Sequence, residues 1–333
     1  MTNPEVSRLA RKLAIYAAPF TLTLLAFVAY MYFMVPANTP AAIHHAVLED
    51  KIHRLIVLAT DTPRVIFAGD SRANANIVPK VFEEKTGLTT VNAAVNYGSL
   101  AETYDAFKEN GVLGKKRLIV ISESSYDIND AVFHFQDVDW QIVVHEPFGI
   151  QKLQDIWRYY YLFLNFEFDQ FKRFLRAEDL RKDAFMTPAQ VSEQGYLAND
   201  GHMITQGPNR VDIDRGLYEN RHVDGVKLGE FLRAIRGFGA SNDTIVLYMG
   251  PIAPLLRETF ANSDAPLAED HFIQVIKDSI QAYPNIHFVD VRLREFPELT
   301  DDMFADWVHL NDSGAPIFTA HMAEILRAQK FIK

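Results

Sequence analysis

The chain of 333 residues contains no cysteine. That absence excludes a disulfide framework, a thiolate metal site and a cysteine nucleophile. Positive charge is also scarce, because 33 Lys and Arg residues stand against 43 Asp and Glu residues and give a formal net charge of −10. A nucleic-acid-binding protein needs a cationic surface to neutralise phosphates, so we expect no nucleic-acid partner. With 48% hydrophobic and 23% charged residues, the composition is globular, and it excludes a disordered or multi-pass membrane chain.

One long stretch, residues 13–35, has no charged residue and could cross about 30 Å of hydrocarbon as a helix. Arg8, Arg11 and Lys12 precede it, and no Lys or Arg follows until Lys51. This asymmetry predicts one transmembrane helix in the inner membrane, with everything after it on the periplasmic side. Two alternatives stay open. A cleaved signal peptide is disfavoured by the length of the stretch and by the lack of a clean cleavage site. A buried core helix is disfavoured by the one-sided basic flank.

Short apolar segments alternate with amphipathic ones along much of the remaining chain. This alternation predicts an α/β fold, a doubly wound (flavodoxin-like) parallel sheet with helices on both faces. Ligands of such folds bind beyond the carboxyl ends of the strands. The expected strands are residues 64–68, 89–95, 117–122, 244–249 and 286–291, and the expected helices are residues 78–85, 100–113, 227–238, 268–282 and 314–329.

The predicted organisation has three parts. Residues 1–36 form a cytoplasmic tip and the transmembrane anchor, residues 37–62 form a stalk, and residues 63–333 form the domain. Residues 126–225 break the strand–helix alternation and are expected to be a long helical and aromatic insertion. Its most aromatic part, residues 156–175, is either core packed on the domain or an exposed surface for a glycan, a partner or the bilayer. Because Phe outnumbers Trp and Tyr there, an exposed surface would favour a partner or the bilayer.

Two motifs far apart in the sequence carry reactive side chains. Gly69-Asp70-Ser71 directly follows the first expected strand, where a serine hydroxyl would lie at the carboxyl edge of the sheet. Asp306 precedes His309 by three residues, a spacing that lets the carboxylate accept the imidazole Nδ1–H and leaves Nε2 to take a proton from a serine. Taken singly, the serine could only cap a helix, and the Asp/His pair could lie in a solvated turn.

Together the motifs resemble the SGNH/GDSL hydrolase family. The middle block reads VNAAVNYG over residues 91–98, so Gly98 matches the second-block glycine of that family. The resemblance covers about residues 64–125 and 225–329, and it implies a triad of Ser71, His309 and Asp306. It also implies an oxyanion hole made by the backbone N–H groups of Ser71 and Gly98.

The third block departs from the family pattern G-x-N-D and reads SESSYD over residues 122–127, with Asn129 and Asp130 following. A serine, Asn129 or no group at all remain as the third oxyanion donor. A variant third block, an anchor and an insertion are similar to the membrane-anchored subgroup that modifies cell-surface polymers. That subgroup includes the alginate and cellulose O-acetylation proteins and the D-alanyl transfer protein of teichoic acid synthesis.

The resemblance therefore implies an extracytoplasmic acyltransferase or esterase that acts on a cell-surface or secreted polysaccharide, with acetyl as the expected acyl group. A membrane-bound O-acyltransferase is the expected partner. The alternative function is a non-catalytic assembly or polymer-binding subunit of such a complex. We expect no cofactor and no metal, because His44, His45, His202 and His222 are scattered and lack a ligand-spaced carboxylate cluster.

Overall fold

The computed structural model describes Lys12 and residues 15–19, 21–23, 48–59, 62–96, 98–128, 194, 196–198, 222–261 and 265–333. The chain divides into two compact units. One unit contains Met1–His45 and Phe135–Ala184, and the other contains Ala46–His134 and Phe185–Lys333. All residues discussed below as parts of a functional site belong to the second unit.

The second unit is built on a five-stranded sheet in which every neighbouring pair of strands is parallel. The strand order is β2-β1-β3-β4-β5, as in flavodoxin-like folds, so the order of the strands reverses between β1 and β3. In register, Gly69 at the end of β1 lies opposite Ser122 at the end of β3. The strands are β1 (Val65–Gly69), β2 (Thr90–Asn92), β3 (Leu118–Ser122), β4 (Thr244–Met249) and β5 (Ile286–Asp290).

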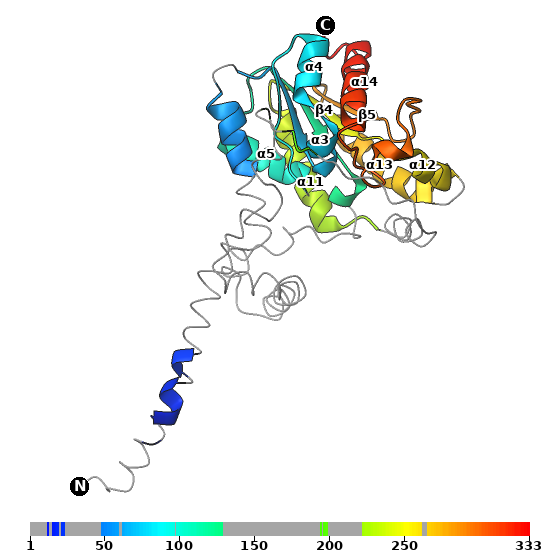
Figure 1. Ribbon diagram of the computed structural model, residues 1–333. Helices are drawn as coiled ribbons and strands as arrows, with labels where there is room; N and C mark the ends of the chain where they lie inside the picture. The colour runs from blue at the N-terminus through cyan, green and yellow to red at the C-terminus, as the bar shows by residue number, and fades with distance from the viewer. Residues whose placement is uncertain are drawn as a thin grey trace, which may run out of the picture. The chain divides into compact units, whose positions relative to one another are not determined.

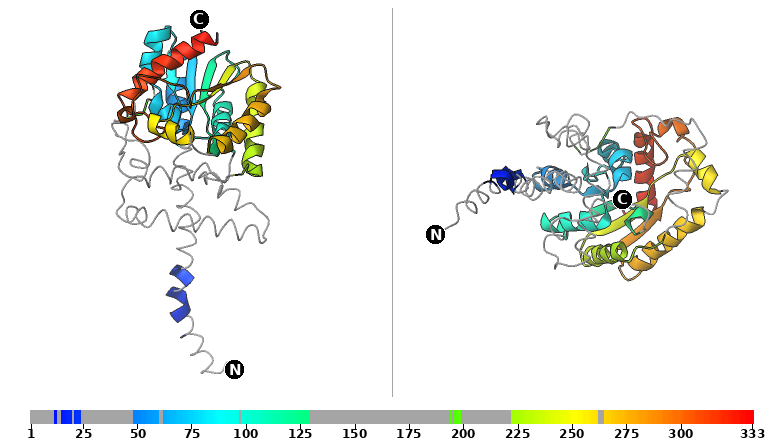
Figure 2. Two further views of the ribbon diagram at one scale, coloured as in Figure 1. Left: turned by 90° about the vertical axis from the view of Figure 1, so that its right-hand side faces the viewer. Right: turned by 90° about the horizontal axis from the view of Figure 1, so that it is seen from below.

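Helices cover both faces of this sheet (Figure 1 and Figure 2). Alternate residues of β1 point to opposite faces, so Val65 and Phe67 join one hydrophobic core while Ile66 and Ala68 join the other. The first core includes residues of α3 (Ser71–Asn76), α4 (Pro79–Thr86), α12 (Pro254–Ala261) and α14 (Gly314–Ala328). The second includes residues of α5 (Leu100–Glu109), α11 (Gly225–Gly239) and α13 (Ala265–Ile280). The predicted parallel α/β sheet is confirmed.

The structure describes residues 48–59 and 62 of the segment predicted as a stalk. Residues 48–52 are helical and continue into a π-helical turn, η2 (His53–Val57). Four apolar side chains of this segment are buried in the second core, namely Leu48, Ile52, Leu55 and Ile56. Residues 48–57 are therefore part of the domain's core and not only a spacer.

The predicted anchor lies mostly outside the described residues. Residues 15–19 and 21–23 of that stretch are helical. Among the residues that the structure describes, no helix has both the length and the apolar character needed to cross a bilayer. The aromatic segment 156–175 also lies outside the described part of the chain.

Candidate active site

Gly69 allows the backbone to turn sharply between β1 and the candidate nucleophile. Its φ of +100° lies in the region that side chains disfavour, and a Cβ there would lie 2.3 Å from the carbonyl oxygen of Ser122. Only glycine can therefore let β1 pass this close to β3 and still turn into α3. The turn places Ser71 as the first residue of α3, just beyond the carboxyl edge of the sheet.

Asp70 fixes the start of α3. Its Oδ1 accepts the backbone N–H of Arg72 at 3.0 Å, which makes Asp70 the N-cap of the helix. The buried Arg72 side chain lies near the other carboxylate oxygen, with Nε 4.0 Å from Oδ2. The first N–H groups of a helix have no acceptor within the helix, and Ser71 is the first residue of α3, so the role of its N–H as an oxyanion donor stays a prediction.

The loop that carries His309 is a compact hairpin closed by backbone contacts. The N–H of Ala305 donates to the carbonyl of His309 at 2.8 Å, and Phe304 and Leu310 pair as an isolated antiparallel bridge. The loop is also tied to the segment after β4, because the N–H of Ala253 donates to the carbonyl of Trp307 at 2.9 Å. The loop thus holds His309 firmly against the carboxyl edge of the sheet.

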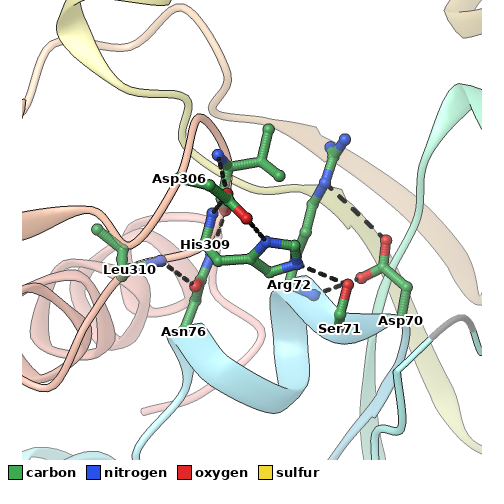
Figure 3. Close-up of polar contacts among 8 residues, drawn as sticks. Asp70, Ser71, Arg72, Asn76, Asp306, His309 and Leu310 are labelled. Carbon is green, nitrogen blue, oxygen red and sulfur yellow. Dashed lines mark hydrogen bonds and ion pairs between the residues drawn. The ribbon is translucent and has the colours of Figure 1, made fainter. Parts of the chain in front are cut away.

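Three predicted residues come together in one chain of hydrogen bonds (Figure 3). Nε2 of His309 lies 2.6 Å from Oγ of Ser71, and Nδ1 lies 2.7 Å from Oδ2 of Asp306. The serine and the histidine are 238 positions apart in the sequence. The order serine, imidazole, carboxylate is the arrangement in which a histidine can take a serine proton while the carboxylate fixes its tautomer.

Asp306 is held in its charged form. Burial raises its pKa, but the hydrogen bond and the charge of His309, with two backbone N–H donors, outweigh burial and lower the pKa to about 2. Those donors are the N–H groups of Val308 and His309, each 2.9 Å from Oδ1. One oxygen of the carboxylate therefore binds the loop backbone while the other faces the imidazole. Because the two oxygens have different partners, the carboxylate is fixed in one rotation.

Asn76 joins α3 to the histidine loop, a role that the sequence did not suggest. Its side chain is fully buried, its Nδ2 donates to the carbonyl of Val308 at 3.1 Å, and its Oδ1 accepts the N–H of Leu310 at 2.7 Å. The two ends of the amide thus form hydrogen bonds with Val308 and Leu310, the residues on either side of His309 (Figure 3). Because Ser71 is on the same helix, Asn76 fixes the distance between nucleophile and base.

Gly98 lies against the turn that carries the nucleophile. A Cβ at this position would come within 2.3 Å of the carbonyl oxygen of Gly69, so no other residue permits this approach. The N–H of Gly98 donates to the carbonyl of Val95 at 3.1 Å in this structure. To serve as an oxyanion donor, this N–H would have to share or exchange that bond, and the assignment of Gly98 stays a prediction.

The side chains of the third block whose burial the structure describes are all buried at the end of β3. Glu123 is 0% exposed, and burial, followed by the nearby Asp127 and Asp70, raises its pKa well above the ordinary range. Ser124 and Ser125 are buried as well. Asn129, the other candidate for a third oxyanion donor, lies outside the described residues.

Comparisons with known proteins give only distant similarities. No family model matches the sequence, and no curated protein matches it significantly. Among solved structures, the chain is similar to a protein from Streptococcus pneumonia named for platelet activating factor, with 14% identity and a TM-score of 0.40 over 86% of this chain and 92% of that one. It is also similar to a lipase/acylhydrolase from Enterococcus faecalis, with 11% identity and a TM-score of 0.37 over 81% and 97% of the two chains. TM-scores this low carry no conclusion about activity, which must rest on the geometry of the site.

Proposed function

We propose that the protein is a serine acyltransferase or ester hydrolase in which Ser71 is the nucleophile, His309 the general base and Asp306 the residue that orients it. The observation that supports this function most directly is the unbroken chain from Ser71 through His309 to Asp306, with contacts of 2.6 and 2.7 Å. Three features of the surrounding fold, the Gly69 turn, the Asn76 contacts and the charged Asp306, all serve that chain.

The proposed reaction has two half-reactions. Oγ of Ser71 attacks the acyl carbonyl carbon while its proton passes to Nε2 of His309, and the N–H of Ser71, with that of Gly98, binds the oxyanion. The tetrahedral intermediate then expels the alcohol, which takes the proton from Nε2 and leaves the acyl group on Ser71. In the second half, an acceptor hydroxyl gives its proton to Nε2 while its oxygen attacks the acyl carbonyl, and the acyl–Oγ bond then breaks as Nε2 returns the proton to Oγ of Ser71. Water as acceptor makes the protein an esterase, and a sugar hydroxyl makes it a transferase.

We further propose that the acceptor is a cell-surface or secreted polysaccharide, that the acyl group is acetyl and that the reaction takes place on the periplasmic side of the inner membrane. One observation supports the location. Residues 13–35 lack charge and follow a basic flank, as expected of a single transmembrane helix whose following domain is outside the cytoplasm. The polysaccharide and a membrane-bound O-acyltransferase partner are supported by the architectural resemblance alone.

The test of the catalytic proposal is turnover of a chromogenic acetyl ester by purified variants. Ser71→Ala should abolish turnover, and His309→Ala should do nearly the same, because triad residues act as a unit. Ser313→Ala is the matched control, since this exposed serine precedes α14 without capping it through its side chain, and its loss should leave turnover unchanged. Turnover by Ser71→Ala at the wild-type rate would contradict the proposal.

A second arm separates the enzyme from the non-catalytic alternative. A fluorophosphonate probe should label the wild-type protein at Ser71 and should not label Ser71→Ala. A wild-type protein that turns over no ester and takes no label would instead favour the assembly-subunit function. For the acceptor, cells that carry Ser71→Ala should lose O-acetyl groups from their surface polysaccharide, and unchanged acetylation would rule out that substrate class.

A further inference from the structure

Lys51 carries a buried amine that contacts α3, the helix on which Ser71 lies. It belongs to the helical residues 48–52, the first described segment after the predicted anchor, and its side chain is 1% exposed. Nζ donates to Oδ1 of Asn74 at 2.8 Å and to the carbonyl oxygen of Ala94 at 2.7 Å. A lysine whose head group ends on two fixed acceptors in the protein interior is unlike the usual lysine, whose charged head remains in water.

The two acceptors belong to the two pieces of backbone that would bind the oxyanion. Asn74 is on α3, one turn after Ser71, and its own N–H donates to the carbonyl of Asp70 at 3.1 Å. Ala94 directly precedes the turn from Val95 to Gly98, in which the N–H of Gly98 donates to the carbonyl of Val95 at 3.1 Å. The Nδ2 group of Asn74 also donates to Oδ1 of Asn96 in that turn at 3.1 Å. The amine therefore ties the nucleophile helix to the glycine turn.

Burial of this amine is costly for stability. Burial, and secondarily the positive charge of Arg54, lowers the pKa of Lys51 to about 7. A methionine would fill much the same space without removing a charged or strongly polar group from water. The contacts of Lys51 hold the two segments at a fixed separation, and a methionine could not make them.

We propose that Lys51 is a positioning residue of the active site, which sets the distance between the Ser71 helix and the Gly98 turn from the segment that follows the anchor. This inference rests on the proposed acyl-transfer function and extends it to a part of the chain outside the three sequence blocks that carry the family resemblance. It also links activity to the seating of residues 48–57, which the buried Leu48, Ile52, Leu55 and Ile56 hold against the domain. Displacement of this segment would withdraw the amine and loosen the oxyanion site.

The test is the kinetics of Lys51→Ala with a small acetyl ester. Since misplacement of catalytic groups by about 1 Å can cost 10²-fold, kcat should fall by about 10- to 100-fold, while KM should change little because a small ester makes few other contacts. Propylamine has the atoms that the substitution removes, so millimolar propylamine should restore part of kcat. Lys227→Ala removes another buried lysine, at the start of α11, and should show neither the kcat loss nor the rescue.

Lys51→Met keeps the apolar stem and covers the case in which the alanine variant fails to fold. The methionine variant should be folded by circular dichroism and should show the same loss of kcat. A folded Lys51→Met protein with wild-type kcat would overturn the inference, as would a folded Lys51→Ala protein whose kcat is unchanged. A wild-type protein that neither turns over the ester nor labels at Ser71 would show instead that the proposed function itself has failed, and the inference would fall with it.

Discussion

Replacement of Asp306 by Asn tests the catalytic geometry most finely, because it changes almost nothing except the position of one proton. Oδ1 of Asp306 accepts two backbone N–H groups at 2.9 Å, and Oδ2 faces Nδ1 of His309 at 2.7 Å. The asparagine must keep its carbonyl oxygen on the two N–H donors, so its NH₂ group faces Nδ1. Nδ1 then has to accept, the ring proton moves to Nε2, and Nε2 can no longer take the proton of Ser71.

The magnitude follows from the cost of avoiding this outcome. Flipping the amide would forfeit two backbone hydrogen bonds, each worth about 0.5–1.5 kcal/mol, and would leave donors facing donors. The unproductive tautomer is therefore the stable one in Asp306→Asn. For a triad held this way, we expect kcat to fall by about 10⁴, which corresponds to about 5 kcal/mol of lost transition-state stabilisation.

The assay is initial-rate turnover of a chromogenic acetyl ester, with near-ultraviolet circular dichroism to confirm that the variant is folded. Asp312→Asn is the matched control, because this residue lies three positions beyond His309 and accepts the hydroxyl of Tyr196 at 2.7 Å, which an asparagine can also do. The control should keep nearly full activity. A folded Asp306→Asn protein within tenfold of the wild-type rate would refute the tautomer argument.

Three further predictions concern stability. Gly69→Ala should lower the free energy of unfolding by about 3 kcal/mol or more, because it combines a positive φ with a clash against Ser122. Gly87→Ala should lower it by only about 1–2 kcal/mol, because φ there is +72° but the added Cβ would meet open space. Equal losses of the two variants in urea denaturation would contradict this. Asn76→Ala should lower the free energy of unfolding by about 2–5 kcal/mol, because the N–H of Leu310 and the carbonyl of Val308 lose their partner. The kcat of this variant should fall as well. A stable, fully active variant would show that the contacts of Asn76 with the histidine loop are dispensable. Burial lowers the pKa of Lys51 to about 7 in the folded chain, whereas an exposed lysine in the unfolded chain has its ordinary pKa of about 10.5, so the unfolded chain binds one more proton than the folded chain between these pH values. The free energy of unfolding of the wild type, relative to Lys51→Met, should therefore rise by up to about 1.4 kcal/mol per pH unit from pH 7 to 10, and a flat difference would contradict the buried amine.

Much of the sheet could be predicted because its signals are local. The segments around Val65, Leu118, Thr244 and Ile286 are short apolar runs between helical patterns, and each forms a parallel strand within a residue or two of the expected bounds. The expected strand over residues 89–95 is shorter, and ends at Asn92, because the following residues turn toward Gly98 beside β1. The short helix α3 and the helix α12 were not among the expected helices.

The motifs that contain Ser71 and His309 could be recognised from the sequence, but the residues that hold those motifs in place could not. Nothing local indicates that Asn76 reaches residues 308 and 310, because those contacts span more than 230 positions. One feature of the sequence does indicate that Lys51 is buried. This lysine shares a helical face with Leu48, Ile52 and Leu55, and a lysine on an apolar face needs a buried partner. A stalk over residues 37–62 would not need this apolar face to be buried, so that interpretation gave no reason to expect a buried Lys51.

The central claim is that Ser71 carries the acyl group, and direct detection of the acyl-enzyme tests it best. The wild-type protein would be mixed with excess acetyl ester, quenched in acid within one turnover and digested for peptide mass spectrometry. The account predicts one added acetyl group on the peptide that contains Ser71, and none on that peptide in Ser71→Ala. An acetyl group found on another residue, or rapid turnover with no acylated Ser71 peptide at any quench time, would contradict it.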